Sequence, residues 1–219
     1  KKKITINPMN IKTLNGPSYE IENNYQLKGY KIIAGTDEAG RGPIAGPVVA
    51  AAVILDKKNI PDGINDSKKL SEKNRKKLFY EIKKYADVGV GVGDVEKIDN
   101  INILQSSLWA MKQAVMHLKE KPDLVLVDGN KDINPQYNSV PIIKGDGVSL
   151  SIAASSIIAK VIRDELMVKF SYIFKEYMFE VNKGYPTPKH LLILKKIGPS
   201  SIHRLTFKPV IISKANLKN

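Results

Sequence analysis

Residues 30–55 read YKIIAGTDEAGRGPIAGPVVAAAVIL, and this stretch indicates the class of the fold. Residues 30–36 predict a strand that ends at two acidic side chains, Asp37 and Glu38. Residues 47–55 are almost entirely apolar, which predicts a second strand that is buried on both faces. Strands of that kind are typical of α/β proteins, in which helices cover both faces of the sheet.

Strand and helix patterns continue along the chain on the C-terminal side of this stretch. Residues 88–95 predict a strand that alternates Val with Gly, so we expect another element close to its glycine face. Further strands are predicted at 124–127 and 140–143, and helices at 67–85, 103–118, 151–177 and 190–197. This order predicts an α/β fold with a mixed five-stranded sheet, flanked by helices and followed by a small helical C-terminal extension.

The length and composition exclude several classes of protein. The chain has 219 residues and no cysteine, which excludes a disulfide scaffold, a thiolate zinc site and a cysteine nucleophile. The apolar run at 47–55 is far shorter than the ~20 residues of a membrane-spanning helix. We therefore expect a monomeric cytoplasmic protein with no membrane partner. We expect an N-terminal arm at residues 1–28, a core at 29–168 and a basic helical region at 169–219.

The net charge of +13 predicts a polyanionic partner such as nucleic acid. The excess is concentrated after residue 146, where 12 Lys and Arg face 4 Asp and Glu. We therefore expect the C-terminal third to contact the phosphates of a duplex. A lysine-rich composition with solvated surfaces is the alternative explanation for the same excess.

Four acidic residues lie at or just beyond the ends of predicted strands: Asp37, Glu38, Asp128 and Asp146. Because sites of α/β proteins form at the carboxyl ends of parallel strands, we expect these side chains to converge. A single acid in such a position more often caps a helix or faces water. Two carboxylates ~4 Å apart repel by about 4 kcal/mol at an effective dielectric constant near 20, so a cluster needs a counter-charge. Oxygen ligands suit Mg²⁺ or Mn²⁺, and a pair of such ions is able to cleave phosphodiesters.

The glycines of residues 35–46 do not form a nucleotide-binding loop. Residues 35–42 have the glycine spacing of a phosphate-binding loop but lack its Lys-Ser/Thr pair and carry two acids instead. Ala45 occupies the position of the last glycine in a dinucleotide-binding fingerprint. Both nucleotide-binding interpretations are therefore rejected.

Five blocks resemble ribonuclease HII, the type 2 ribonuclease H, and its bacterial members in particular. In order, they are GTDEAGRGPIAGPVVAAAVIL, DSKKLSEKNR, LVDGN, KGDGVSLSIAASSIIAKVIRDE and GYPTPKH with GPSSIHRLTF, within residues 33–209. The resemblance implies a ribonuclease H-like fold with its catalytic core at 29–168. It implies that the four acids are catalytic and hold two Mg²⁺ or Mn²⁺ ions in the reacting complex.

The resemblance also implies a set of substrate-binding residues: Gly40, Arg41, Gly42, Ser67, Lys68, Lys69 and Tyr185. Glycine lacks the Cβ that would obstruct the approach of the backbone to a sugar. Taken alone, Tyr185 is more often a packing residue, and the resemblance favours stacking on the substrate instead. Lys144, next to the acids, is expected to touch phosphate or to neutralise them. Two alternatives are open for Lys160, Arg163, His203 and Arg204: contacts with phosphate, or structural contacts within the protein.

The activity implied by the resemblance is cleavage of the RNA strand of RNA/DNA hybrids and nicking on the 5′ side of a ribonucleotide embedded in duplex DNA. The products are a 3′-hydroxyl and a 5′-phosphate. A non-catalytic hybrid-binding protein is the alternative, and it requires the loss of at least one acid. A carboxylate-metal phosphatase for small molecules is a third hypothesis, which the basic C-terminal third and the Gly-Arg-Gly loop oppose.

Overall fold

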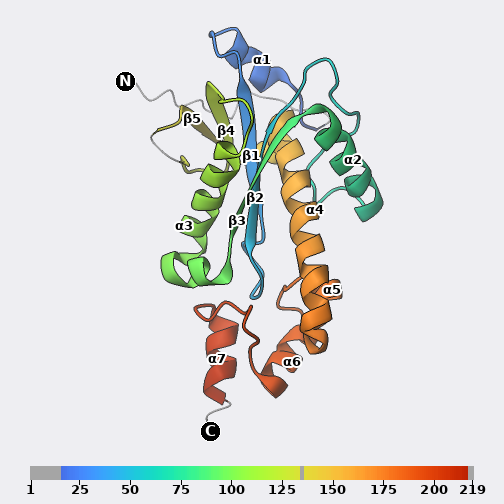
Figure 1. Ribbon diagram of the computed structural model, residues 1–219, viewed down its shortest axis with the longest axis vertical. Coiled ribbons are helices and arrows are strands. Elements are labelled where there is room, and N and C mark those ends of the chain that lie inside the picture. The colour runs from blue at the N-terminus through green and yellow to red at the C-terminus, as the bar shows by residue number, and fades with distance from the viewer. Residues whose placement is uncertain (1–15, 134–135, 217–219) are drawn as a thin grey trace.

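The computed structural model describes residues 16–133 and 136–216 and contains one mixed five-stranded sheet (Figure 1). Its strands, in chain order, are β1 (Ile33–Ala39), β2 (Val48–Ile54), β3 (Asp87–Gly93), β4 (Leu124–Asp128) and β5 (Ser139–Ile142). Their order across the sheet is β3-β2-β1-β4-β5. β2 is antiparallel to both of its neighbours, whereas β1, β4 and β5 run parallel. The predicted mixed five-stranded sheet is confirmed.

Helices cover both faces of this sheet (Figure 1). The helices are α1 (Glu20–Gln26), α2 (Glu72–Tyr85), α3 (Val95–Met116), α4 (Leu150–Ile173), α5 (Phe179–Asn182), α6 (Pro188–Ile197) and α7 (Lys208–Asn216), with 3-10 turns η2 (Gly145–Gly147) and η3 (Lys175–Tyr177). Along β2, Ala51 and Val53 pack with α2 and α4, whereas Val48, Ala50 and Ala52 pack with α3. β2 is therefore buried on both faces, as its apolar sequence predicts. Among the described residues, no helix is long and apolar enough to cross a membrane.

Two predicted boundaries next to the acids differ from the structure. β1 does not end before the acids, because its antiparallel pairing with β2 continues through Asp37 and Glu38 to Ala39. α2 begins only at Glu72, because the Ser71 side chain accepts a hydrogen bond from the Asn74 N–H and caps the helix there. Residues 67–70 are therefore a loop rather than the first turn of a helix.

The glycines of β3 allow α3 to lie directly on the sheet. A Cβ added at Gly89 would lie 2.0 Å from the carbonyl oxygen of Ala114, and one added at Gly91 would lie 2.1 Å from that of Ala110. The close element expected on this glycine face is α3. On the opposite face of the sheet, a Cβ at Gly35 would lie 2.2 Å from the Ser151 carbonyl carbon, so the first turn of α4 is equally close.

The C-terminal segment packs against the connection between β1 and β2. Ala45 forms an isolated antiparallel bridge with His203, and the Ile44 N–H donates to the Gly184 carbonyl at 2.9 Å. Ala45 also packs with Met167, Tyr177 and Phe179 in a small apolar cluster of its own. The glycine-rich connection is thus held between the end of the sheet and the C-terminal helices.

Candidate functional site

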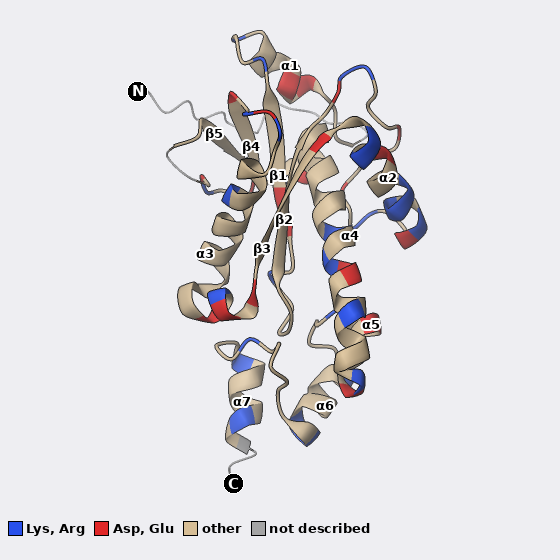
Figure 2. Ribbon diagram, viewed as in Figure 1, with Lys and Arg blue, Asp and Glu red and all other residues tan. Residues whose placement is uncertain are grey.

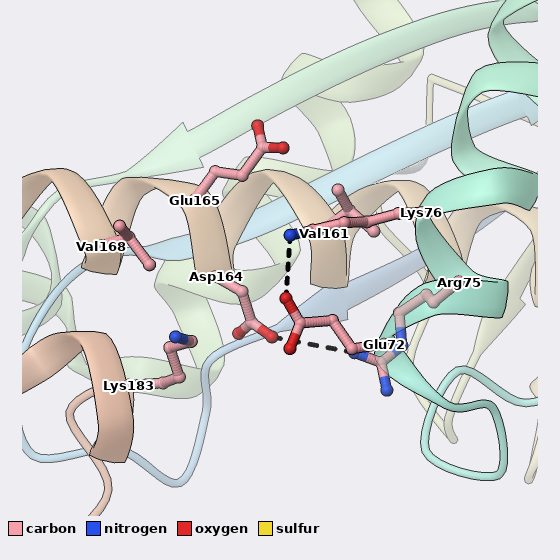
Figure 3. A pocket seen from close by; sticks show the side chains of 8 residues that line it. All are labelled: Glu72, Arg75, Lys76, Val161, Asp164, Glu165, Val168 and Lys183. Carbon is pink, nitrogen blue, oxygen red and sulfur yellow. Dashed lines mark ion pairs between the residues drawn. The ribbon is translucent and has the colours of Figure 1, made fainter.

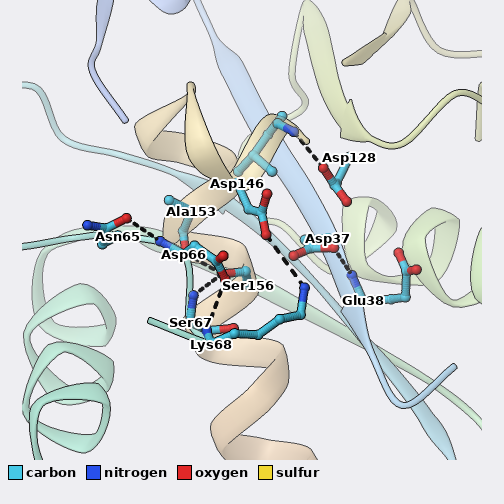
Figure 4. Close-up of polar contacts among 12 residues, drawn as sticks. Asp37, Glu38, Asn65, Asp66, Ser67, Lys68, Asp128, Asp146, Ala153 and Ser156 are labelled. Atoms are coloured by element: carbon cyan, nitrogen blue, oxygen red, sulfur yellow. Dashed lines mark hydrogen bonds and ion pairs between the residues drawn. The ribbon is translucent and has the colours of Figure 1, made fainter. Parts of the chain in front are cut away.

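The four predicted acids lie in one group at the C-terminal ends of the neighbouring strands β1 and β4 (Figure 4). Asp37 and Glu38 come from β1, and Asp128 is the last residue of the neighbouring parallel strand β4. Asp146 lies in the η2 turn, and the Gly145 N–H donates to Asp128 Oδ1 at 2.7 Å. That hydrogen bond ties the turn carrying Asp146 to the end of β4. The expected convergence of strand-end acids therefore occurs.

Burial raises the pKa of all four carboxyls, and repulsion from neighbouring carboxylates raises it further. Asp37 is 5 % exposed; burial raises its pKa well above the usual value, and the charges of Glu38, Asp128 and Asp146 raise it further. Burial likewise raises the pKa of Glu38, Asp128 and Asp146. The raised pKa values indicate that the positive charge around these four carboxylates is too small to balance their negative charge.

Two side-chain cations touch the group from its exposed side. Lys68 Nζ lies 3.7 Å from Asp146 Oδ2, and Arg41 Nη1 lies 3.3 Å from Glu38 Oε1. Partial burial lowers the pKa of Lys68, but Asp146, Asp37, Asp66 and Asp128 together raise it above its usual value. Asp66 is thus a fifth carboxylate near the group, which the strand-end pattern alone did not indicate.

The donors at this edge suit a divalent cation. Every candidate ligand is a carboxylate oxygen, the donor type preferred by Mg²⁺ and Mn²⁺. Within residues 16–133 and 136–216, no three acidic or imidazole side chains are already arranged as a set of metal ligands. Instead, Asp128 accepts from Gly145 and Asp146 faces Lys68. A cation bound among these acids would relieve the repulsion that raises their pKa, so the residues fit such an ion.

The predicted Gly-Arg-Gly loop lies directly after β1, and its two glycines differ in their surroundings. Arg41 and Gly42 are exposed, and a Cβ at Gly42 would lie 3.5 Å from Cε1 of Tyr185. Gly40 is buried with φ +106, and a Cβ there would lie 2.1 Å from Nε of Arg163. The sequence predicts that both glycines open the backbone toward a sugar. At Gly40 the missing Cβ instead makes room for a buried arginine, and the positive φ itself favours glycine.

The loop at residues 65–70 brings Lys68 to the same site (Figure 4). The Ser67 N–H donates to Ser156 Oγ of α4 at 3.3 Å, and Arg75 donates to the carbonyls of Ser67 and Leu70 at 2.8 Å. Ser67 is consequently buried, whereas Lys68 and Lys69 are exposed. Lys144 is exposed as well, in the left-handed conformation that turns the chain from β5 into η2.

A small cavity lies between α2 and α4, away from the four acids (Figure 3). Its volume of about 30 Å³ accommodates roughly one water molecule. Arg75 and Asp164 form an ion pair across it at 3.8 Å, and Lys76 pairs with Glu72 at 2.8 Å. None of the predicted catalytic or substrate-binding residues lines this cavity.

The structure decides between the alternatives for three basic residues near the glycine-rich loop. Arg163 and Arg204 are 0 % exposed and His203 is 1 % exposed, so none of them is available to contact a phosphate on the surface. Lys160 is partly exposed and pairs with Asp164 at 2.8 Å. Sequence patterns did not distinguish these buried arginines from surface ones, because both lie in segments rich in basic residues.

Comparison with known proteins identifies relatives over most of the chain. The family model described as Ribonuclease HII matches residues 34–210. Ribonuclease HII of Caldicellulosiruptor bescii is 50% identical over 196 residues, covering 89% of this chain and 95% of the relative. That of Idiomarina loihiensis is 53% identical over 187 residues, covering 85% and 100%. The crystal structure of ribonuclease H2 from Pyrococcus horikoshii OT3 matches with a TM-score of 0.72 and 29% identity, covering 86% of this chain and 100% of that one.

Proposed function

This chain belongs to the ribonuclease HII family of endoribonucleases that act on RNA/DNA hybrids, and on that basis we propose that it nicks duplex DNA on the 5′ side of an embedded ribonucleotide. The nick leaves a 3′-hydroxyl and a 5′-phosphate. The observation that carries the proposal is the group formed by Asp37, Glu38, Asp128 and Asp146, gathered from β1, β4 and η2 at one edge of the sheet. We further propose that the chain acts as a monomer.

The four carboxylates are the residues that would hold the metal. When bound, a pair of Mg²⁺ or Mn²⁺ ions supplies an activated water and stabilises negative charge on the leaving 3′-oxygen. The protein contributes the fixed placement of the ligands: Asp128 is oriented by the Gly145 N–H, and Asp37 Oδ1 accepts from the Glu38 N–H at 2.7 Å. Lys68 neutralises part of the charge on Asp146.

Recognition of the ribonucleotide falls to the loop next to the acids. The 2′-hydroxyl distinguishes RNA from DNA and both donates and accepts hydrogen bonds. The exposed backbone of Arg41 and Gly42 offers donors to it, and the Tyr185 ring beside Gly42 is positioned to stack on the neighbouring nucleotide. Lys68, which pairs with Asp146, and Lys144, two residues before Asp146, are exposed beside the acids. Together with the exposed Lys69 they would contact the flanking phosphates.

A non-catalytic hybrid-binding protein is the alternative on the same scaffold. It requires a lost ligand, but all four acids are present, and burial raises the pKa of each. The intact set supports catalysis.

The test is cleavage of a labelled duplex that carries one ribonucleotide, with Mg²⁺ or Mn²⁺ present. Wild type should nick it once, on the 5′ side of the ribonucleotide, and Asp128→Asn should be slower by at least about 100-fold, because an uncharged ligand holds the metal poorly. Asp62→Asn is the matched control, since Asp62 is an exposed acid and should leave the rate unchanged. An absent nick with wild type, or an equal rate with Asp128→Asn, would refute the proposal.

A further inference from the structure

We propose that Arg163 and Arg204 are positioning residues for ribonucleotide recognition: their buried guanidiniums turn the carbonyls of the glycine-rich loop inward, so that the N–H groups of Arg41 and Gly42 point at the substrate. This inference rests on the proposed function of the loop in binding the 2′-hydroxyl. It concerns two side chains that touch neither the acids nor the solvent.

Arg204 binds the loop through four hydrogen bonds to backbone carbonyls. Its Nη2 donates to Gly40 at 2.6 Å, its Nη1 donates to Arg41 at 3.2 Å and to Pro43 at 2.7 Å, and its Nε donates to Gly46 at 3.0 Å. A single planar guanidinium therefore fixes four peptide groups of the connection between β1 and β2.

Planar trans peptides convert these contacts into an orientation of the N–H groups. The Gly40 carbonyl and the Arg41 N–H belong to one peptide group, and in a trans peptide they point in opposite directions. The described chain contains no cis peptide, so a Gly40 carbonyl turned toward Arg204 directs the Arg41 N–H away from the protein interior. The next peptide does the same for the Gly42 N–H through the Arg41 carbonyl. Neither N–H has a hydrogen-bond acceptor among the described residues, and both residues are exposed.

Arg163 joins the same loop to the segment that carries Tyr185. Its Nε donates to Pro47 at 3.0 Å, its Nη2 to Ala45 at 3.2 Å and its Nη1 to Lys183 at 3.0 Å. Its guanidinium carbon lies 5.9 Å from the centre of the Tyr185 ring. Its Nε occupies the space beside Gly40 that a Cβ would fill. Arg163 thereby sets the distance between the N–H donors and the tyrosine ring.

Neither buried arginine forms an ion pair with a described acid within 4 Å. Removing a charge from water is costly, so the surrounding carbonyls must satisfy it. Seven carbonyl contacts are made, and none is to a side chain. The hydrogen bonds that compensate the two charges therefore come from backbone carbonyls, while Asp164 and Asp99 act only from beyond ion-pair distance. The orientation of the loop backbone is thus coupled to the burial of these charges.

The experiment compares two constants measured on the same enzyme: KM for a duplex with one ribonucleotide, and Ki for the all-DNA duplex of the same sequence as a competitive inhibitor. Arg204→Lys keeps the positive charge but replaces the planar fork with a compact ammonium that cannot hold four separate carbonyls. We expect KM to rise about tenfold, as for one or two misplaced hydrogen bonds, while Ki changes less than about twofold. Arg163→Lys should act in the same direction.

A purely structural role gives a different result. Partial unfolding lowers the apparent kcat by removing active molecules but leaves KM and Ki of the remaining molecules unchanged. Ile82→Ala is the matched control, because Ile82 is 0 % exposed and belongs to the apolar cluster between α2 and α4 rather than to the loop. It should lower the melting temperature without changing the ratio of Ki to KM.

Each outcome bears on the proposal. If wild type cuts the ribonucleotide duplex and both lysine variants keep its Ki/KM ratio, the positioning role is refuted while the proposed function stands. If wild type does not cut, the proposed function itself fails. If circular dichroism shows that Arg204→Lys does not fold, KM and Ki are measured on Arg163→Lys and Gly40→Ala instead. The second of these places a methyl group against Arg163. Failure of all three to fold would also refute the proposal, because the arginines would then serve folding alone.

Discussion

Asp37 illustrates, at the scale of a single residue, how the proposed catalysis conflicts with stability. Its carboxylate is buried beside three other acids, and burial and repulsion raise its pKa well above the usual value. Such a charge destabilises the metal-free protein in the pH range above the unfolded pKa of about 4. The site is therefore held together by the rest of the fold rather than by its own contacts.

Asp37→Asn should stabilise the metal-free protein, by about 1–2 kcal/mol in the free energy of unfolding at pH 8. The difference from wild type should shrink as the pH falls toward the unfolded pKa of about 4, because the wild-type carboxyl then takes up a proton. Urea unfolding in EDTA measures both effects. Adding Mg²⁺ should raise the stability of wild type more than that of the variant; equal stabilisation would contradict the placement of the metal at Asp37.

The buried pair His190 and His203 makes a second prediction at this scale. The Ser200 N–H donates to His203 Nδ1 at 3.0 Å, so neutral His203 carries its proton on Nε2, which lies 3.0 Å from Nε2 of His190. His190 Nδ1 in turn lies 2.8 Å from the Tyr185 carbonyl and donates to it. Burial lowers the pKa of both rings, to about 3 for His203. The chain of hydrogen bonds therefore needs both rings neutral.

Stability from this pair should be complete above pH ~6.5 and should decrease as the pH falls toward 3, because the unfolded chain takes up protons first. Between pH 7 and 5 we expect wild type to lose about 1–2 kcal/mol relative to His203→Gln, measured by urea unfolding at each pH. An unchanged profile for His203→Gln would contradict the neutral pair.

Between elements, the contact of α1 with the start of α4 supports the turn that carries Asp146. Glu22 is 0 % exposed and accepts hydrogen bonds from Ser149 Oγ at 2.7 Å and from the Ser151 N–H at 2.9 Å. Its negative charge lies at the N-terminus of α4, where the helix dipole favours an anion. The Ser18 N–H also donates to the Val148 carbonyl at 3.2 Å, next to η2.

Glu22→Ala should lower the free energy of unfolding by about 2–3 kcal/mol, because it leaves buried donors at the start of α4 without an acceptor. Glu20→Ala on the exposed side of the same helix is the control and should change it by less than about 0.5 kcal/mol. Urea unfolding checks both variants. A loss as small as that of Glu20→Ala would show that α1 does not support α4.

Over the molecule as a whole, the basic excess divides into buried and exposed charges. Arg163 and Arg204, two of the 12 cations after residue 146, are buried in the fold and cannot bind phosphate. Figure 2 shows Lys and Arg along α4, α6 and α7, and also on α2. We propose that the exposed lysines near the C-terminus contact duplex phosphates beside the acidic site.

Lys195→Gln with Lys196→Gln, at the exposed end of α6, should flatten the plot of log affinity against log salt by about 0.9 for each phosphate that is no longer neutralised. The plot is measured by fluorescence anisotropy on a labelled duplex. Lys28→Gln with Lys31→Gln is the matched control, because those lysines lie near α1, at the opposite end of the molecule from α6 (Figure 1). Equal flattening by both pairs would show a diffuse effect of net charge instead of a C-terminal interaction.

Local sequence patterns were sufficient to predict the sheet, its flanking helices and the four acids of the candidate site. Those patterns are an apolar run long enough for one strand, alternating Gly and Val, and acids at strand ends. The division of the chain at residues 28 and 168 and the roles of the individual site residues stay predictions. β1 extends beyond its predicted end, because pairing with β2, a non-local interaction, carries the strand through Asp37 and Glu38.

The roles of the basic residues and glycines around the loop became apparent only from the packing of the folded chain. The sequence leaves open whether Arg163 and Arg204 contact phosphate or the protein itself. Their burial arises because α4 and the C-terminal segment meet at the β1–β2 connection. The missing Cβ of Gly40 likewise makes room for the buried Arg163 side chain rather than for an approaching sugar. Contacts between residues more than 100 positions apart leave no periodic pattern in a single chain, so the packing that orients the loop emerges only when the chain is folded.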